Sequence, residues 1–299
     1  MNNDHASSPL VTMCVPVYNH EHFVVDSVRS IIEQTYQNIE LIIIDDGSTD
    51  RSAEKVASLI DECEARFTRF RFVSRPNKGL SGTLNDALQW ATGTYFSALA
   101  SDDILYPTKT AVLVKHMMEN PKCVASFGSV SLIDDKGIER GFRKSAGKHN
   151  FDEIFLLKTE LPAPASMVVL QAIIEAGSYN PEVKIEDWDM WMRLTIGNDK
   201  FVEVLPDVLA KYRMHPANTM KQHDLVHDGL LLIVKQHKTH PLYNRVLCIL
   251  NCVRFRNLAT GRKKEALGLL AKLLMNPDSY REPRLYQGVL YLLLKWRAG

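Results

Sequence analysis

The sequence has almost no net charge and no long apolar run. Its 36 basic residues balance 35 acidic ones over 299 residues, so no overall field attracts nucleic acid. No segment reaches the ~18 consecutive apolar residues that a membrane-spanning helix needs. The first ten residues, MNNDHASSPL, lack the basic and apolar segments of a signal peptide. We therefore expect a cytoplasmic protein without a nucleic-acid partner.

Cysteine pairs and glycine-rich phosphate loops are also missing. The five cysteines are odd in number and form no CxxC pair, which indicates a reducing compartment and argues against a zinc site. Most of them lie in apolar surroundings and are expected in the core. Neither GxGxxG nor GxxxxGK followed by Ser or Thr occurs, which argues against a dinucleotide-dependent or P-loop enzyme.

The first hundred residues alternate between predicted strands and predicted helices. Aliphatic runs predict strands at 10–17, 39–45, 70–74 and 94–100, and helical spacing of apolar residues predicts helices at 21–34, about 50–65 and 79–90. Thr49 or Asp50 is the expected cap of the second helix. This alternation predicts an α/β fold, a mostly parallel sheet with helices on both faces.

The second half of the chain is less regular. Strands are predicted at 123–133, 163–170, 201–205 and 208–212, a polar loop at 134–150, and a helix at 186–196. From about residue 222 onward the pattern is helical.

All four strand ends in the first half are polar, and two of them carry paired aspartates. The run LIIIDDGSTD at 41–50 reads as a strand buried on both faces that ends on two carboxylates, although burial makes charge costly. Ligands of such sheets bind beyond the carboxyl ends of the strands. Acid pairs in these places also serve as turn or cap residues, so each pair has that alternative.

Four segments together resemble a known family. VPVYNHEHFVVDSVRSIIEQTYQNIELIIIDDGSTD, NKGLSGTLNDAL, LASDDILYP and EDWDMWMRL are similar to the inverting family 2 glycosyltransferases with a GT-A fold, over about residues 9–220. The resemblance implies a nucleotide-sugar donor, usually linked to UDP, and a divalent cation, Mn²⁺ or Mg²⁺. It further implies a role in building a bacterial surface polysaccharide of the O-antigen or capsule type.

The donor would be bound at the strand ends. Asp46 is expected to accept a hydrogen bond from uracil N3–H with Asp45 behind it, and Tyr18 to flank the base. Lys78 either meets a phosphate or is a solvated loop residue. The residues expected to contact the nucleotide sugar are Pro16, Tyr18, Asn19, Asp45, Asp46, Asn77, Lys78, Ser101, Asp102 and Arg213.

The metal is expected at SDD, residues 101–103. The resemblance places Asp102 near the ribose and Asp103 on the cation, which favours oxygen ligands. Many relatives have a further aspartate where this chain has Ala100. His215 either completes the metal site or is a structural histidine, and His20, His22 and the C-terminal histidines are expected at the surface.

The catalytic base is expected from the Glu186–Asp187 pair at the start of a predicted helix. An inverting transfer needs one carboxylate to take the proton of the acceptor hydroxyl. The family motif puts the base on the second acid, Asp187, with Glu186 as the runner-up. Trp188 and Trp191 either stack on the acceptor sugar or belong to the core.

The sequence predicts two regions. Residues 1–220 form the catalytic domain, with a nucleotide-binding half at about 9–103 and an acceptor half at about 120–220. Residues 221–299 form a basic amphipathic helical region, in which eleven basic residues oppose three acidic ones from position 241 on. Its last helix, LYQGVLYLLLKWRAG, either packs on the core, forms a homodimer contact, or lies in a membrane interface on the inner face of the cytoplasmic membrane.

The predicted function is metal-dependent transfer of a sugar from UDP to a glycan acceptor, which could be lipid-linked. The alternative is a non-catalytic module that binds a nucleotide sugar or a partner. The intact SDD and ED pairs argue against that alternative. A processive synthase is disfavoured because no spanning helix and no QxxRW-like motif is found.

Overall fold

The computed structural model describes residues 8–197, 199–216, 218 and 222–294. These residues divide into two compact units. Unit 1 runs to Phe151 and adds Thr159–Pro181 and Glu186–His215. Unit 2 takes Asp152–Lys158, Glu182–Ile185 and the described residues from Pro216 onward. The second unit therefore includes two short segments from the middle of the chain.

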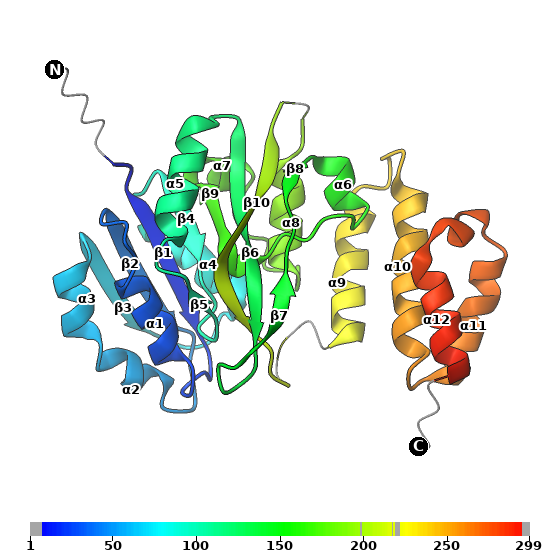
Figure 1. The fold of residues 1–299 in the computed structure, drawn as a ribbon, viewed down its shortest axis with the longest axis horizontal. Coiled ribbons are helices and arrows are strands. Elements are labelled where there is room, and N and C mark those ends of the chain that lie inside the picture. Colours follow the sequence, from blue (N-terminus) through cyan, green and yellow to red (C-terminus); the bar gives the residue numbers. More distant parts are fainter. Residues whose placement is uncertain (1–7, 198, 217, 219–221, 295–299) are drawn as a thin grey trace. The chain divides into compact units, whose positions relative to one another are not determined.

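The first four main strands of unit 1 form the predicted parallel array. They are β1 (Val11–Val17), β2 (Ile39–Asp45), β3 (Arg69–Ser74) and β4 (Tyr95–Ala98), in the order β3-β2-β1-β4. Every residue of β2 is buried, as expected for a strand covered on both faces. The register aligns Val17 with Asp45 and Asp45 with Ser74, so these strands end at one edge of the sheet (Figure 1).

Helices cover both faces of this sheet. Alternate residues of β1 and β2 pack with α1 (Val24–Ile32), α2 (Ser52–Ala57), α3 (Ile60–Arg66) and α5 (Lys109–Glu119) in one core cluster. The helix α4 (Gly79–Trp90) contacts β1 and β2 from the other side (Figure 1). The single helix predicted over 50–65 is two helices. Asp50 Oδ1 accepts the Ser52 N–H at 2.9 Å, but the N-cap residue of the first helix is Arg51, one position after the predicted cap.

The second half of the sheet is mixed. It contains β5 (Ile104–Leu105), β6 (Cys123–Ile133), β7 (Glu139–Arg143), β8 (Gly147–His149), β9 (Ser166–Val169) and β10 (Phe201–Arg213). β9 runs antiparallel between β4 and β6, and β10 runs parallel to β6. The strands predicted at 201–205 and 208–212 are one strand whose register with β6 shifts between Val204 and Val208.

Short helices complete unit 1. The turn η1 (Ala163–Ala165) leads into β9, and α7 (Leu170–Glu175) follows it. The helix α8 (Glu186–Leu194) contacts β6 and carries the predicted acid pair in its first turn. The α/β fold with a central sheet and flanking helices is confirmed.

Unit 2 is helical, as predicted for the C-terminal region. It contains most of α6 (Phe151–Phe155) and all of α9 (His223–Gln236), α10 (Tyr243–Leu258), α11 (Lys263–Leu274), η3 (Pro277–Arg281) and α12 (Pro283–Leu294). Cys248, Cys252 and Phe255 of α10 lie in its core. All five cysteines are buried and free, which confirms them as core residues. Among the described residues, no helix combines the length and hydropathy needed to cross a bilayer.

Candidate active site

The polar strand ends meet at one edge of the unit 1 sheet. β1, β2 and β3 end together, and the segment after β4 supplies Ser101–Asp103. β10 has the same direction as β4 and ends at Arg213, with His215 two residues beyond. We call this edge, together with the first turn of α8, the strand-end site.

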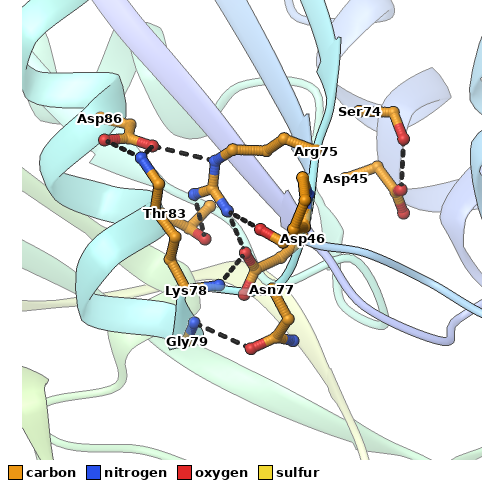
Figure 2. A network of polar contacts seen from close by, with 10 residues as sticks. Asp45, Asp46, Ser74, Arg75, Asn77, Lys78, Gly79, Thr83 and Asp86 are labelled. Atoms are coloured by element: carbon orange, nitrogen blue, oxygen red, sulfur yellow. Dashed lines mark hydrogen bonds and ion pairs between the residues drawn. The ribbon is translucent and has the colours of Figure 1, made fainter.

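Asp45 and Asp46 are both buried, and they have different partners. Asp45 Oδ2 accepts a hydrogen bond from Ser74 Oγ at 2.8 Å, whereas its buried Oδ1 has no hydrogen-bond partner among the described residues. Asp46 Oδ1 accepts the Lys78 N–H at 2.8 Å and a hydrogen bond from Arg75 (Figure 2). Asp46 Oδ2 accepts no hydrogen bond from the described residues. The carboxylate of Asp46 is thus fixed through one oxygen only.

Arg75 holds Asp46 in place, a role that was not predicted from the sequence. Its guanidinium also donates to Asp86 at 2.9 Å and to Thr83 at 3.0 Å, both on α4 (Figure 2). The Arg75 side chain is 13% exposed and that of Asp46 is 6% exposed. The position of Arg75 in the sequence could have indicated this role. Arg75 directly follows a predicted strand, and the neighbouring strand ends on two acids.

The loop after β3 is shaped by close backbone contacts. Gly47 has φ +76°, and a Cβ there would lie 2.8 Å from the Asn77 backbone nitrogen, so glycine is required. Asn77 Oδ1 accepts the Gly79 N–H at 3.0 Å. The Lys78 ammonium is half exposed and pairs with Asp86 at 2.9 Å. The Lys78 side chain therefore faces α4 in this structure, and its predicted contact with a phosphate stays a prediction.

The loop after β1 presents one exposed aromatic ring. Tyr18 is 50% exposed, as expected of a residue that flanks a ligand. Asn19 instead braces the loop: its φ is +53°, its Oδ1 accepts the Thr49 N–H at 2.8 Å, and its N–H donates to Ser48 Oγ. Pro16 is half-buried within β1.

Two histidines surround Asp102. His215 Nε2 lies 2.8 Å from Asp102 Oδ2, and His20 Nδ1 lies 4.0 Å from Asp102 Oδ1. His20 Nδ1 is also 2.8 Å from Ser101 Oγ, and Ser101 is buried. The expectation that His20 is a surface residue is wrong, because the turn after β1 carries its ring inward. The His20 side chain is 24% exposed, and His227 of α9 is buried.

The charges of these histidines act on Asp102. Burial would raise the pKa of Asp102, but the hydrogen bond with His215 and the charges of His20 and His215 outweigh burial and lower it. Burial lowers the pKa of His20, while the charge of Asp102 opposes that change. The arrangement thus favours an ionised Asp102 beside two imidazoles.

These three residues fit a divalent cation. One donor atom each of His20, Asp102 and His215 lies within 4.8 Å of the others. Imidazole nitrogens and carboxylate oxygens are ligands that first-row divalent ions accept. Asp103, the residue predicted to bind the metal, is outside this group, and its metal role stays a prediction.

Asp103 and Arg213 form a buried support beneath the cation group. Asp103 Oδ1 accepts the Arg213 N–H at 2.8 Å, and the Arg213 guanidinium donates to the Asp102 carbonyl oxygen at 2.8 Å. Burial, followed by the charge of Asp102, holds the pKa of Asp103 well above its ordinary value. Arg213 also lies over the Phe23 ring at 4.7 Å. Arg213 therefore connects loops in this structure, and its predicted approach to a diphosphate stays a prediction.

The acid pair of α8 has raised pKa values. Burial, followed by the charge of Asp187, raises the pKa of Glu186 to about 8. Burial also raises the pKa of Asp187, whose Oδ1 accepts the Trp188 N–H at 2.6 Å. A carboxylate with a raised pKa is a stronger base once it is ionised.

Tyr212 links the acid pair to the aspartates after β4. Burial raises the pKa of Tyr212 to about 12, and the charges of Asp103, Asp102 and Asp187 act in the same direction. Carboxylates from two distant segments therefore act on one side chain of β10. No sequence pattern indicates this role for Tyr212, because the acids that act on it come from distant segments.

The two tryptophans of α8 differ. Trp191 is 3% exposed and packs edge-to-face on Phe127 at 4.9 Å, so it belongs to the core. This placement corrects its assignment to acceptor binding. Trp188 is half-buried and remains a candidate for that role.

Known protein sequences resemble this chain over most of its length. Residues 12–166 match the model for glycosyl transferase family 2. An uncharacterized glycosyltransferase, MJ1057 of Methanocaldococcus jannaschii, is 30% identical over 79% of this chain and 78% of its own length. An uncharacterized glycosyltransferase of Rickettsia felis is 29% identical over 72% of this chain, but the match spans only 36% of that relative. The Escherichia coli UDP-Glc:alpha-D-GlcNAc-diphosphoundecaprenol beta-1,3-glucosyltransferase WfgD is 28% identical over 69% of this chain and 77% of its own length.

Solved structures share the fold. S. aureus TarS in complex with UDP-GlcNAc matches with a TM-score of 0.63 at 17% identity, over 95% of this chain and 81% of that one. Mannosyltransferase PcManGT from Pyrobaculum calidifontis, in complex with GDP-Man and Mn²⁺, matches with a TM-score of 0.63 at 16% identity, over 98% of this chain and 90% of that one. Together with the family match and the MJ1057 relative, the strand-end site and GT-A fold lead to one conclusion: the chain belongs to glycosyltransferase family 2.

Proposed function

We propose that this protein is an inverting, metal-dependent transferase that moves a sugar from a UDP-sugar to a hydroxyl of a glycan acceptor. The observation that carries the proposal is that acids of the strand-end site have pKa values shifted in opposite directions. Asp102 is favoured as the ion, whereas the pKa values of Glu186 and Asp187 are raised. Enzymes use carboxylates with different pKa values in this way: one stays ionised and stabilises charge, and another transfers a proton.

The nucleotide would be read by the loops after β1 and β2. Asp46 is held through Oδ1 by Arg75 and the Lys78 N–H, so Oδ2 is oriented to accept uracil N3–H. The exposed Tyr18 ring supplies a stacking surface for the base. TarS in complex with UDP-GlcNAc supports a UDP-linked donor on this fold.

The diphosphate would lie at the residues after β4. A divalent cation held by Asp102 and His215, with Asp103 close behind, would offset the negative charge on the departing UDP. Burial of Ser101, Asp102 and Asp103 limits water at this place. PcManGT in complex with GDP-Man and Mn²⁺ supports a divalent cation on this fold.

Asp187 would act as the general base. It takes the proton of the acceptor hydroxyl as that oxygen attacks the anomeric carbon on the face opposite UDP. The bond to the UDP oxygen breaks in the same step, so the anomeric configuration inverts. Glu186, whose pKa is raised to about 8, holds a proton at neutral pH and adds no second charge beside the base.

The acceptor would be a lipid-linked glycan, and residues 221–299 would bring the enzyme to the membrane that holds it. WfgD carries a diphosphoundecaprenol acceptor in its name, which supports a pathway for surface polysaccharide such as O-antigen. Eight side chains between the start of α11 and the end of α12 make up what we call the C-terminal apolar face: Leu267, Leu274, Met275, Tyr280, Tyr286, Leu290, Leu293 and Leu294, each at least 47% exposed.

Hydrogen bonds connect three residues of this face. The Tyr286 hydroxyl donates to the Tyr280 carbonyl oxygen at 2.8 Å, and the Tyr280 hydroxyl donates to the Leu274 carbonyl oxygen at 2.7 Å. Lys264, Lys272 and Arg281 are exposed on the same elements. Apolar side chains flanked by cations suit the surface of an anionic bilayer. The end of the last predicted helix, Lys295–Gly299, lies outside the described residues. We propose peripheral association with the inner face of the cytoplasmic membrane.

The experiment that tests the donor is a binding and hydrolysis panel. UDP-sugars and GDP-mannose are titrated with Mn²⁺, Mg²⁺ or EDTA, using the wild type, Asp103→Ala, and Asp61→Ala at an exposed site on α3 as the control. We expect metal-dependent binding or slow hydrolysis of one UDP-sugar, lost in Asp103→Ala and kept in Asp61→Ala. Failure to bind any nucleotide sugar with metal present would reject the donor assignment and favour the non-catalytic module.

The stereochemistry has its own test. With the donor known, the product formed on a lipid-linked diphosphate-sugar acceptor is examined by NMR for the configuration of the new glycosidic bond. An α-linked UDP-sugar should give a β-linked product. A product with the donor's configuration would reject the inverting mechanism.

A further inference from the structure

His20 is the least expected member of the cation group. It lies on the loop after β1, whereas Asp102 follows β4 and His215 follows β10. The ring centroids of His20 and His215 are 5.8 Å apart and the rings are nearly perpendicular, at 85°. Both imidazoles thus approach the carboxylate of Asp102 from different directions, as ligands of one ion do.

The backbone of His20 is fixed from several sides. Its N–H donates to Ser52 Oγ at 2.8 Å, and its carbonyl oxygen accepts the N–H groups of Phe23 and Val24 at 3.0 and 2.9 Å. His215 in turn stacks on Phe23, with ring centroids 5.4 Å apart. Supporting contacts of this kind orient metal-binding histidines before the ion arrives.

A simpler role for His20 is a hydrogen bond to Ser101. His20 Nδ1 lies 2.8 Å from Ser101 Oγ, and that contact alone satisfies the nitrogen. Yet the same Nδ1 lies 4.0 Å from Asp102 Oδ1, and one atom of each of the three residues falls within 4.8 Å of the others. A small movement of these side chains would bring all three donors onto one ion. The two roles predict different metal selectivity.

The donor types decide which ion is favoured. Mg²⁺ prefers an all-oxygen octahedral shell and keeps several waters, whereas imidazole raises affinity for transition ions. Asp102 and His215 alone offer one nitrogen, and His20 adds a second. Building on the proposed function, we infer that His20 is a third protein ligand of the cation and makes this site select Mn²⁺ over Mg²⁺, with open positions left for the diphosphate.

The test measures metal binding without turnover. Full-length protein stripped with EDTA is titrated with Mn²⁺ by electron paramagnetic resonance, and with Mg²⁺ in competition, in the absence of nucleotide. His20→Ala is compared with His22→Ala, whose side chain is 77% exposed two residues further along the same loop. We expect Mn²⁺ affinity to fall by about tenfold or more in His20→Ala, with little change in His22→Ala.

A second variant distinguishes metal binding by His20 from its hydrogen bond to Ser101. His20→Asn keeps a polar group near the position of Nδ1 but removes the imidazole. We expect this variant to remain folded and to lose the preference for Mn²⁺ over Mg²⁺. An unchanged preference in both His20 variants would show that His20 is only a hydrogen-bond partner of Ser101 and would overturn the inference.

The proposal of a UDP-sugar donor can be tested independently of the inference on His20. UDP-sugar binding is measured on the same samples by calorimetry. Mn²⁺ binding that depends on His20 without any UDP-sugar binding would keep the ligand set and reject the donor. UDP-sugar binding in a protein that takes up no Mn²⁺, with or without nucleotide, would reject the ligand set and keep the donor.

Discussion

At the scale of residues, the site depends on contacts between segments far apart in the chain. The acid pairs could be predicted because each stands where a buried strand or an amphipathic helix changes to polar residues. Arg75, His20 and Tyr212 could not be predicted, because their roles come from partners on other elements. A single sequence does not show which residues from different elements lie close together. For the same reason, the burial of Trp191 against Phe127 became known only from the fold.

Arg75 is expected to support both stability and nucleotide binding. Arg75→Ala removes a partner from the buried Asp46 carboxylate, and breaking such a pair typically costs on the order of 3–5 kcal/mol. We expect urea denaturation to show a loss of that order, together with weaker UDP binding. Arg71→Ala, at an exposed position of β3, the strand that Arg75 follows, is the control and should change neither quantity. Equal effects of the two substitutions would contradict a role for Arg75 in holding Asp46.

The two acids of α8 are expected to behave differently. Asp187→Asn should lower kcat by about 10²–10⁴-fold, because the proton of the acceptor has no base to accept it. Glu186→Gln should keep most activity at neutral pH, since glutamine resembles the protonated form of a residue whose pKa is raised to about 8.

The pH profile checks this assignment. The acidic limb of kcat/KM should lie above the ordinary range of an aspartate, because burial raises the pKa of Asp187. A further change near pH 8 should vanish in Glu186→Gln. Loss of activity in Glu186→Gln with activity kept in Asp187→Asn would exchange the two roles.

At the scale of elements, prediction succeeded where burial is continuous. The helix over 79–90 was predicted to the residue, as were the strands over 39–45 and 123–133, because apolar residues recur along each of them. β7 was predicted as loop because its residues, ERGFR, are mostly exposed and give no apolar alternation. The antiparallel pairing of β9 was also not predicted, since direction in a sheet depends on the path of the connection and not on composition.

The first residue of α5 links that helix to the sheet. Lys109 is fully buried, and its ammonium donates to Ser97 of β4 and to the Ser166 carbonyl oxygen of β9 at 2.7 Å. Burial lowers the pKa of Lys109 to about 7 from an ordinary value of 10.5. Between these pH values the unfolded chain binds more protons than the folded one, so Lys109 makes stability rise with pH.

Substitution of Lys109 shows how much of the pH dependence of stability comes from this residue. The free energy of unfolding in urea is measured across pH 7 to 10.5 for the wild type, Lys109→Met, and Lys115→Met at an exposed site on the same helix. The wild type and Lys115→Met should gain stability with rising pH relative to Lys109→Met. Parallel curves for all three proteins would show that Lys109 is not neutralised on folding.

At the scale of the whole molecule, basic and apolar groups concentrate toward the C-terminus. From position 241 on, eleven basic residues oppose three acidic ones. Replacing Leu290 and Leu293 by Glu should strongly reduce co-sedimentation with vesicles of phosphatidylglycerol and phosphatidylcholine. Leu225 and Leu232, exposed on α9, provide the matched double substitution, which should leave binding unchanged.

The same variants show whether the C-terminal apolar face binds a membrane or a second copy of the chain. Wild-type protein should not sediment with vesicles of phosphatidylcholine alone, because the basic groups then lack a counter-charge. If the C-terminal apolar face forms a dimer, light scattering would show a halved mass for the Leu290 and Leu293 variant. That result, without vesicle binding by the wild type, would reject the membrane proposal.

The composition of unit 2 has a consequence for synthesis on the ribosome. Asp152–Lys158 and Glu182–Ile185 belong to this unit, but they leave the ribosome long before α9 to α12. Phe155 and Val183 are buried in the finished protein, so these apolar side chains stay uncovered until the last quarter of the chain is synthesised. At about 5–20 residues per second that delay lasts several seconds. A chain cut near residue 220 would never complete the unit, and we expect it to aggregate rather than to yield an isolated catalytic domain.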